Sequence, residues 1–286
     1  MEYFWLVFGF VLLIVGADIF VEGSSSLAKS FKIPTIIIGL TVVAFGTSMP
    51  EASVSISAAL EGKNDIAVSN VVGSNILNLL VVLGASALIC PVKSNDTAVK
   101  HEIPFSIILT AVFGAIVAFG INLPEGMTGF QAILNSDFKL GLLGGIILLL
   151  FIVYYVYRQI KGAVKSIKNG EIEEEEETQK ISLSMSLKMI VLGLFAIVMG
   201  GNYVVDNACI IAENFGMSEH FIGLTIIAIG TSLPELVTSV VAARKGESDI
   251  ALGNVIGSNI FNIAFVLGAS AVISPMTVNI VLFTIF

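Results

Sequence analysis

Charged residues are scarce in this sequence. Asp, Glu, Lys and Arg make up 13% of its 286 residues, whereas a soluble domain carries about 25%. Apolar residues make up 56%, and the mean hydropathy is +0.96. These values exclude an ordinary cytosolic enzyme and a disordered chain. Apolar runs of the roughly 20 residues that a bilayer span requires recur along the chain without the alternation of barrel strands, which predicts an all-α polytopic membrane protein.

Cysteine and clusters of basic residues are also rare. The two cysteines, Cys90 and Cys209, lie in apolar stretches and are too few for a disulfide framework. The absence of a basic stripe argues against nucleic acid as a partner. The net charge of −8 is concentrated in an acidic cluster at residues 171–177, so it says little about partners.

The apolar runs predict eight helices and the beginning of a ninth near Met276. The predicted helices cover residues 3–27, 34–60, 66–90, 101–121, 140–158, 184–213, 217–243 and 249–274. Residues 122–139 contain Gly, Pro and Asn and predict a loop. Residues 159–183 form the longest polar segment and predict a linker.

The two halves of the sequence repeat each other. When the sequence is shifted by 184 positions, residues 39–91 align with residues 223–275 without a gap, and 31 of the 53 pairs are identical. Each half then forms a five-helix unit, and because five is odd the second copy enters the membrane from the opposite side. We therefore expect a ten-helix fold of two inverted repeats, with residues 1–158 as the first repeat, 159–183 as an acidic linker and 184–286 as the second. By this symmetry we expect the chain to be short at its C-terminus by the end of helix 9 and all of helix 10.

Lysine and arginine are distributed unevenly among the predicted loops. If the N-terminus lies outside, 12 of the 14 fall on the inner side, and only Lys63 and Lys139 fall on the outer side. Basic residues favour the cytoplasmic side. We therefore expect a multi-pass protein of the cell membrane with its N-terminus outside and the 159–183 linker in the cytoplasm.

Two polar motifs interrupt the apolar helices at matched positions. Gly-Thr-Ser-Met-Pro-Glu begins at Gly46, and Gly-Thr-Ser-Leu-Pro-Glu begins at Gly230. The proline in each motif lacks an N–H group, so we expect the preceding helical turn to open. A carboxylate at membrane depth is costly and marks an ion site or pathway. The carboxylates and the hydroxyls that share a helical face with them are Glu51 and Glu235, with Thr47, Ser48, Thr231 and Ser232.

A second pair of motifs places polar residues at every fourth position of a helix. These stripes are Asn70, Ser74 and Asn78 in the first copy, and Asn254, Ser258 and Asn262 in the second. Asn70 and Asn254 are open to a structural explanation as contacts between helices. The combined oxygen ligands, without His, Cys or Met, suit a hard cation such as Na⁺ or Ca²⁺.

A single kinked helix with Thr and Ser is usually structural, but the second glutamate at the matched inverted position argues for function. Asp18 and Glu22 are expected at the inner interface or a cavity mouth rather than as ligands.

The paired G-T-S-x-P-E and G-S-N-x-x-N segments resemble the two alpha repeats of the cation/Ca²⁺ exchanger superfamily, especially its prokaryotic sodium/calcium exchanger branch. The resemblance covers nearly the whole chain. It implies two inverted five-helix repeats, Na⁺-driven Ca²⁺ countertransport, and helices 1 and 6 that slide across an eight-helix core. The ligands that it implies are Thr47, Ser48, Glu51, Ser74, Asn78, Thr231, Ser232, Glu235, Ser258 and Asn262, with the main-chain carbonyls of Ala44 and Ala228.

We accordingly expect a secondary active antiporter that exchanges Na⁺ for Ca²⁺ by alternating access at a midplane site formed by the two repeats. Ca²⁺ and Na⁺ are then the transported ions, no organic cofactor is needed, and one chain in the lipid bilayer suffices. The alternative is a Ca²⁺/H⁺ exchanger whose two glutamates titrate. A channel is disfavoured because carboxylate rings are usually built from symmetric subunits. An intramembrane protease is disfavoured because no His or Lys in these helices could activate a serine, so we expect no enzyme.

Overall fold

The computed structural model describes residues 1–91, 96, 98–122, 136–169, 181–217, 225–226 and 228–279. Its elements are mostly α-helices, with short π-helical segments (η) and three short strands. The first half of the chain contains α1 (Glu2–Phe31), α2 (Thr35–Ile38), η1 (Gly39–Val43), α3 (Ala44–Thr47), α4 (Met49–Leu60), α5 (Asn64–Leu77), η2 (Asn78–Val82), α6 (Leu83–Ile89), η3 (Ala98–Glu102), α7 (Ile103–Phe119), β1 (Ile121–Asn122), β2 (Asp137–Leu140) and α9 (Leu142–Asn169). The second half contains α10 (Leu183–Asn214), α12 (Ala228–Thr231), α13 (Leu233–Arg244), α14 (Ser248–Phe261), η5 (Asn262–Leu267), α15 (Gly268–Ile273) and β3 (Met276–Asn279).

The repeat in the sequence reappears in the element bounds. Helices α3, α4 and α5 begin and end at positions that, moved by 184, are the ends of α12, α13 and α14. Each copy then continues into a π-helical segment that starts at an asparagine, Asn78 or Asn262. The same local sequence therefore produces the same local structure twice.

The chain divides into two compact units. Unit 1 comprises Met1–Pro50, Leu77–Asn95 and Val156–Ser258, and unit 2 comprises Glu51–Ile76, Asp96–Tyr155 and Asn259–Phe286. Each unit thus combines segments from both halves of the duplicated sequence.

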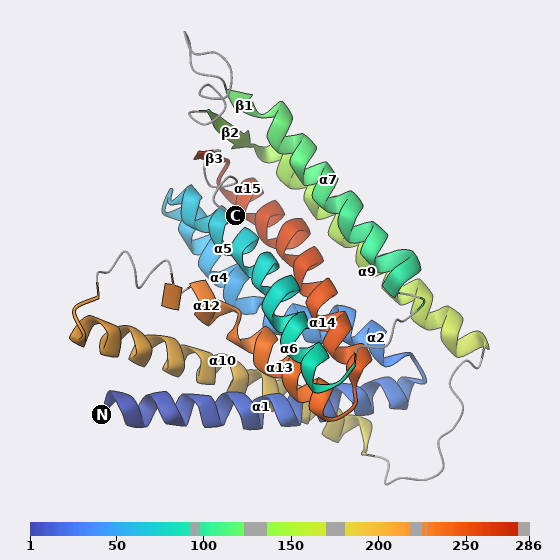
Figure 1. The fold of residues 1–286 in the computed structure, drawn as a ribbon. Helices are drawn as coiled ribbons and strands as arrows, with labels where there is room; N and C mark the ends of the chain where they lie inside the picture. The colour runs from blue at the N-terminus through green and yellow to red at the C-terminus, as the bar shows by residue number, and fades with distance from the viewer. Residues whose placement is uncertain are drawn as a thin grey trace. The chain divides into compact units, whose positions relative to one another are not determined.

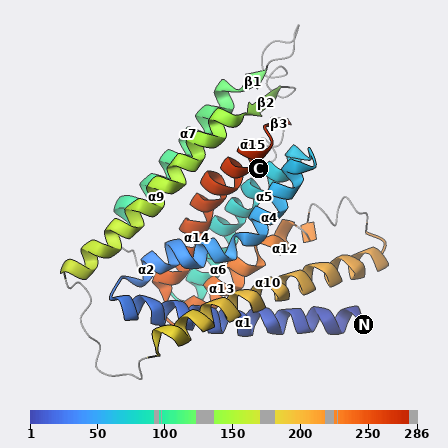
Figure 2. The ribbon, with the colours of Figure 1, turned by 180° about the vertical axis from the view of Figure 1, so that it is seen from behind.

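Unit 1 is organised around the long helices α1 and α10, which lie side by side (Figures 1 and 2). They approach closely at glycines. A Cβ atom added to Gly9 would lie 2.9 Å from the carbonyl oxygen of Gly200, and one added to Gly16 would lie 2.9 Å from that of Gly193. Because the contact positions rise along α1 while they fall along α10, the helices are antiparallel. Small residues permit such close backbone contact between membrane helices.

The α1–α10 contact also relates the two repeats. A shift of 184 positions converts Gly9 to Gly193 and Gly16 to Gly200. The contact of Gly9 with Gly200 therefore has an equivalent in the contact of Gly193 with Gly16. Such reciprocal contacts define a local two-fold relation. Equivalent helices that run antiparallel are what the predicted inverted repeats require.

Unit 2 contains a three-stranded antiparallel sheet in the order β1-β2-β3. Strand β3 pairs with β2 in the register Leu140↔Met276 to Asp137↔Asn279. The prediction that a ninth helix starts near Met276 is therefore wrong for residues 276–279, and residues 280–286 lie outside the described part. Pro275 cannot continue the hydrogen bonding of α15, and the following Thr277 and Val278 are β-branched residues that favour strands.

Two further boundaries differ from the prediction. The segment 122–139 is not entirely loop, because its last residues belong to β2, where Phe138 is fully buried. Helix α9 extends to Asn169 rather than ending at 158, so the first part of the expected linker is helical. In unit 2, α9 packs on α7 through Phe105, whose ring lies 5.4 Å from that of Tyr155.

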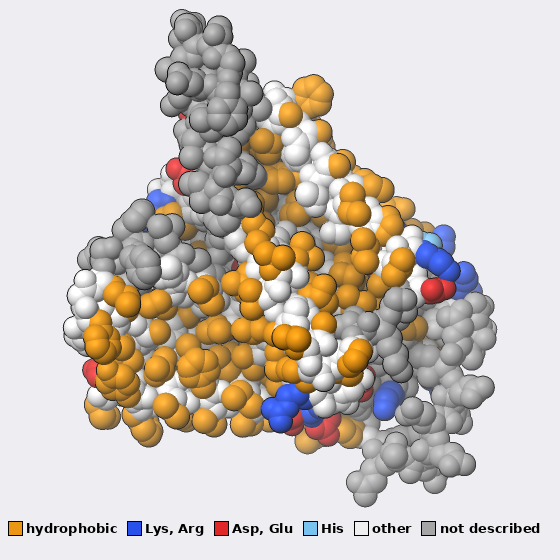
Figure 3. All heavy atoms as spheres, in the orientation of Figure 1, with side chains coloured by type: hydrophobic (Ala, Val, Ile, Leu, Met, Phe, Trp, Pro, Cys, Tyr) orange, Lys and Arg blue, Asp and Glu red, His pale blue; other side chains and the backbone are white. Residues whose placement is uncertain are grey.

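The described residues contain six helices long and apolar enough to cross a membrane, or seven if the pair Thr35–Thr47 and Met49–Leu60 is one bent span. Large apolar side chains are exposed on both long helices of unit 1, for example Phe4 on α1 and Phe195 on α10. Figure 3 shows hydrophobic side chains over the visible face of these helices. A surface of this kind is suited to lipid rather than water. The protein is therefore a multi-pass helical membrane protein.

Candidate functional site

Both proline motifs break their helices at a serine. Helix α3 ends at Thr47 and α4 begins at Met49, so Ser48 separates them with φ −85° and ψ 8°. The two segments are bent by 46°. In the second copy Ser232 has φ −91° and ψ 4°. The predicted opening before each proline is thus confirmed, because the helix is interrupted two residues before the ring that cannot donate a hydrogen bond.

Unit 1 gathers one set of predicted ligands around Glu235, here called the Glu235 cluster. Its members are Ala44, Thr47, Ser48, Glu235, Asn254 and Ser258. The Glu235 side chain has no exposed surface. Ser48 Oγ donates to Glu235 Oε1 at 2.9 Å, and Ser258 Oγ does so at 3.5 Å. Among the described residues, Glu235 Oε2 has no hydrogen-bond partner and Glu235 forms no ion pair.

The carbonyl group of Ala44 brings neutral oxygens together in the same cluster. It accepts a hydrogen bond from Ser48 N–H at 3.1 Å, and the hydroxyl oxygens of Thr47 and Ser258 lie 3.4 and 3.5 Å from it. The hydroxyl oxygens of Thr47 and Ser258 are 3.5 Å apart. A carbonyl, two hydroxyls and a carboxylate within this range form an oxygen-rich group suited to a hard cation.

Unit 2 gathers a second set around Glu51, here called the Glu51 cluster. Its members are Glu51, Ser55, Asn70, Ser74 and Asn262. Ser74 Oγ donates to Glu51 Oε1 at 3.2 Å, and Asn262 Nδ2 donates to Ser74 Oγ at 3.2 Å. The Glu51 and Asn262 side chains have no exposed surface. Each unit therefore contains one buried glutamate bound by serine, with ligand candidates from both sequence repeats.

Two equivalent asparagines in unit 2 bind each other reciprocally. Asn75 Nδ2 donates to the main-chain oxygen of Asn259 at 3.3 Å, and Asn259 Nδ2 donates to the main-chain oxygen of Asn75 at 3.3 Å. The two positions differ by the repeat shift of 184. A local two-fold axis therefore passes between α5 and α14 next to the Glu51 cluster.

Eleven of the twelve predicted ligands have side chains that are at most 8% exposed. Ala228 begins α12, and its side chain is not described. Asn78 is the first residue of η2, and Thr231 and Ser232 lie at the end of α12. Their binding roles stay predictions. The fully buried residues are Thr47, Ser48, Glu51, Asn78, Ser232, Glu235, Ser258 and Asn262, while Ala44 and Ser74 are 1% exposed and Thr231 is 8% exposed.

The sequence reasoning gave no role to Ser55 and Ser239 and left Asn70 and Asn254 open. Asn70 Nδ2 donates to Ser55 Oγ at 2.9 Å, and Asn254 Nδ2 donates to Ser239 Oγ at 2.9 Å. These serines are identical between the repeats, and that identity was the signal that could have revealed the pairs.

Asp18 and Glu22 take part in a different polar contact. Lys245 Nζ lies 3.0 Å from Asp18 Oδ1 and 3.2 Å from Glu22 Oε2. Ser25 Oγ donates to Glu247 in the same region. This contact joins α1 to the loop between α13 and α14, and it gives both acidic residues a partner away from the Glu235 cluster.

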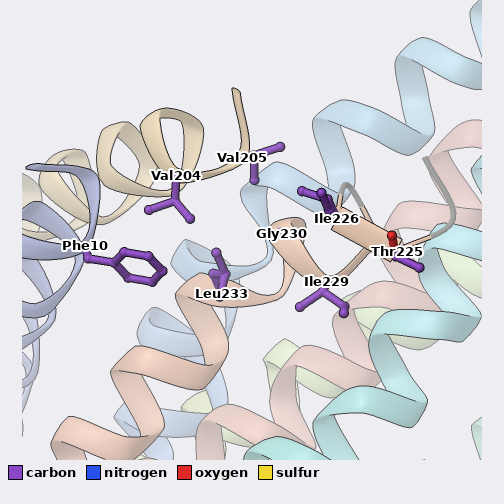
Figure 4. Close-up of a pocket in the computed structure, with 8 residues that line it drawn as sticks. All are labelled: Phe10, Val204, Val205, Thr225, Ile226, Ile229, Gly230 and Leu233. Carbon is purple, nitrogen blue, oxygen red and sulfur yellow. The ribbon is translucent and has the colours of Figure 1, made fainter. Parts of the chain in front are cut away.

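A cavity of about 250 Å³ in unit 1 adjoins the second proline motif (Figure 4). Its lining consists of Phe10, Val204, Val205, Thr225, Ile226, Ile229, Gly230 and Leu233. Its described lining has no carboxylate and is almost wholly apolar. Within the described residues no three His, Cys, Asp or Glu side chains gather as a metal site. A cation site built from the described residues would therefore combine single carboxylates with neutral oxygens.

Comparisons with known proteins agree on one family. The family description "Sodium/calcium exchanger protein" matches residues 1–161 and 185–285. The sodium/calcium exchanger MaX1 of Methanosarcina acetivorans is 34% identical over 298 residues, which cover 96% of this chain and 83% of that protein. The inner membrane protein YrbG of Escherichia coli K12 is 38% identical over 272 residues, covering 94% and 79%. A structure of the sodium-calcium exchanger NCX_Mj, soaked with Na⁺ and Sr²⁺, superposes with a TM-score of 0.80 at 30% identity, covering 99% of this chain and 86% of that one.

Proposed function

Because the chain belongs to the sodium/calcium exchanger family, we propose that it exchanges Na⁺ for Ca²⁺ across the membrane by alternating access. Membership of the family makes it a multi-pass membrane transporter and a Ca²⁺/cation antiporter. The coupling to Na⁺ and the residues that bind the ions are the proposal.

The observation that carries the proposal is the environment of Glu235. This carboxyl group is fully buried and is approached by hydroxyl donors, with no ion-pair partner among the described residues. A buried carboxyl group must be neutralised by a proton or by a bound cation, and the oxygen ligands around Glu235 favour a cation. The unbound oxygen Oε2 is an available ligand atom.

The neutral oxygens of the Glu235 cluster favour Na⁺ as the counter-ion. The Ala44 carbonyl and the hydroxyls of Thr47 and Ser258 are close enough to share one ion. Main-chain carbonyls beside a helix break are where transporters commonly coordinate Na⁺, and the Ala44 carbonyl keeps a second lone pair beside its bond from Ser48 N–H. Ca²⁺ accepts about 6–8 oxygen ligands in irregular arrangements and gains more from carboxylates than Na⁺ does.

Exchange, rather than one-way transport, follows from the energy that the protein needs to change the accessible side of the site when no cation is bound. A buried carboxylate without a cation cannot cross a dry barrier cheaply. The protein therefore changes the side from which the site is accessible only with Na⁺ or Ca²⁺ bound, and one cation is exchanged for the other.

The orientation is part of the proposal. Twelve of 14 basic residues fall on one side when the N-terminus is placed outside, which supports a cell-membrane protein with a cytoplasmic 159–183 segment. Each of the two clusters is made within one chain, which supports a functional monomer.

The proposal is tested by ⁴⁵Ca²⁺ uptake into proteoliposomes that contain the purified protein. Vesicles are loaded with Na⁺, with K⁺, or with a pH gradient in the absence of Na⁺. We expect uptake only into Na⁺-loaded vesicles. Uptake driven by the pH gradient without Na⁺ would favour the Ca²⁺/H⁺ alternative, and no uptake under any gradient would contradict antiport by this chain.

The site is tested by the substitution Glu235→Gln, which keeps the shape and removes the charge. Removing one partner of a buried ion contact costs about 3–5 kcal/mol, so Ca²⁺ uptake should fall by more than about 100-fold. Glu61→Gln is the matched control, because Glu61 is 60% exposed and pairs with Lys63 in a loop. Equal uptake by both variants would reject Glu235 as a ligand.

A further inference from the structure

Asn254 links α13, which carries Glu235, to Thr47 at the end of α3. Its Nδ2 donates to Ser239 Oγ at 2.9 Å and to the main-chain oxygen of Glu235 at 3.4 Å. Its Oδ1 accepts from Thr47 Oγ1 at 2.9 Å. The Asn254 and Ser239 side chains have no exposed surface, so water cannot replace these partners.

The orientation of the Asn254 amide is fixed by this network. A main-chain carbonyl can only accept hydrogen bonds, so the Glu235 carbonyl must face the NH₂ group of Asn254. The amide oxygen is then directed to Thr47 Oγ1, and Ser258 Oγ lies 3.5 Å from it. A flipped amide would place NH₂ against Thr47 and two acceptors together at Glu235.

This orientation decides where the proton of the Thr47 hydroxyl lies. A hydroxyl has one O–H donor and two lone pairs. It can coordinate a cation only when its proton is directed elsewhere. Asn254 Oδ1, at 2.9 Å, is a nearer acceptor for the Thr47 hydroxyl than the Ala44 carbonyl, which is at 3.4 Å.

We propose that Asn254 is a positioning residue for cation binding. It accepts the hydrogen bond of the Thr47 hydroxyl, so that the lone pairs of that hydroxyl and the Ala44 carbonyl stay available to Na⁺. The inference rests on the proposed function. Without Asn254, the Thr47 proton turns to the acceptors that remain, the Ala44 carbonyl or the Glu235 carboxylate, and competes with a cation there.

The first repeat contains a second copy of the hydrogen bonds that the Asn254 NH₂ group donates. In unit 2, Asn70 Nδ2 donates to Ser55 Oγ at 2.9 Å and to the main-chain oxygen of Glu51 at 3.3 Å. The same asparagine-serine pair therefore holds the main chain of each buried glutamate. A chance contact would not be built twice with matching partners.

The test compares Asn254→Leu with Asn207→Leu. Asn207 is also a buried asparagine, but its amide donates to the Tyr203 carbonyl within α10. The measured quantity is the Na⁺ concentration that gives half-maximal Ca²⁺ exchange in proteoliposomes. We expect N254L to raise it about tenfold, which corresponds to the loss of one hydrogen-bonded ligand, and N207L to leave it unchanged. An unshifted Na⁺ dependence in N254L overturns the inference.

Two further variants separate positioning from a general structural role. In a Thr47→Ala background the Thr47 proton is absent, so adding N254L should shift the Na⁺ dependence less than twofold. Additive effects would overturn the inference. Asn254→Asp keeps an acceptor toward Thr47 and loses the donors, so it should shift the Na⁺ dependence less than N254L, and an equal shift would also overturn it. If the unmodified protein shows no Na⁺ dependence, the proposed function fails instead.

Discussion

The glycine contact between α1 and α10 makes a quantitative prediction about stability. A Cβ added to Gly193 would lie 2.7 Å from the main-chain nitrogen of Phe20 and 2.8 Å from the carbonyl oxygen of Gly16. Real Cβ atoms rarely approach closer than 3.0 Å, and ordinary contact begins at 3.4 Å. The substitution Gly193→Ala must therefore separate the two helices by about 0.7 Å at this point, because backbone atoms cannot rotate away as a side chain can.

The expected loss of stability in G193A is obtained by comparison with a glycine that has room for a Cβ atom. Overpacking a closely packed contact costs about 1–3 kcal/mol. A Cβ added to Gly114 in α7 would meet nothing within 4 Å. Both alanine variants gain the same intrinsic helix propensity, up to about 1 kcal/mol. The difference between them therefore measures the overpacking alone, and G114A should exceed G193A in stability by about 1–3 kcal/mol.

Thermal unfolding of the two purified variants in the same detergent provides the measurement. We expect G193A to unfold at a lower temperature than the unmodified protein and G114A at an equal or higher one. A G193A variant as stable as G114A would refute the close backbone contact between α1 and α10.

Two further predictions concern other contacts of unit 1. A Cβ on Gly230 would lie 2.2 Å from Val205 Cγ2, so Gly230→Ala should impair folding or exchange, and a second change, Val205→Ala, should restore it. This rescue is read from the yield of monodisperse protein and from Ca²⁺ uptake, and failure of the double variant would argue against the contact. Lys245→Gln removes the ion pairs to Asp18 and Glu22, whose side chains are about half exposed. Its effect on unfolding should stay below about 1 kcal/mol and disappear in about 1 M salt, whereas a larger, salt-independent loss would show that the pairs are shielded from solvent.

The sequence predicted much of the fold because its main features are local or duplicated. The length of the apolar run predicted α10 within one residue at each end. The proline motifs predicted an opened turn, and the structure places the breaks at Ser48 and Ser232. The repeat predicted that α4 and α5 recur as α13 and α14. Inverted pairing of the repeats followed from counting helices, and the antiparallel contact of α1 and α10 agrees with it.

The wrong predictions depended on contacts between distant segments. Met276 follows an apolar helix and is itself followed by apolar residues, which is why a helix is expected there. Its segment instead pairs with β2, about 140 residues earlier in the chain. The end of α9 was misplaced because Arg158 begins a polar stretch, while an amphipathic helix needs no uniformly apolar sequence to continue.

The candidate site was predicted in its composition but not in its hydrogen bonding. Buried Glu, Ser, Thr and Asn residues at matched positions indicated an oxygen-rich site. Their spacing could not show that Asn254 faces Thr47, because the two residues are 207 positions apart. It also could not show that Ser239 accepts the amide proton that fixes this orientation.

The reciprocal contact of Asn75 and Asn259 has a consequence for how a duplicated transporter could arise. Each asparagine supplies a side-chain N–H donor and a main-chain carbonyl acceptor, so one residue can satisfy its own copy across a two-fold axis. A carboxylate or an ammonium group would instead meet its own charge there. The contact therefore suits two antiparallel copies of one half-length sequence, because it needs no difference between the partners. The contact of Lys245 with Asp18 and Glu22 is of the other kind, because the first repeat has Glu61 where the second has Lys245. That contact depends on residues that differ between the two halves, whereas the asparagine pair depends on residues that are the same.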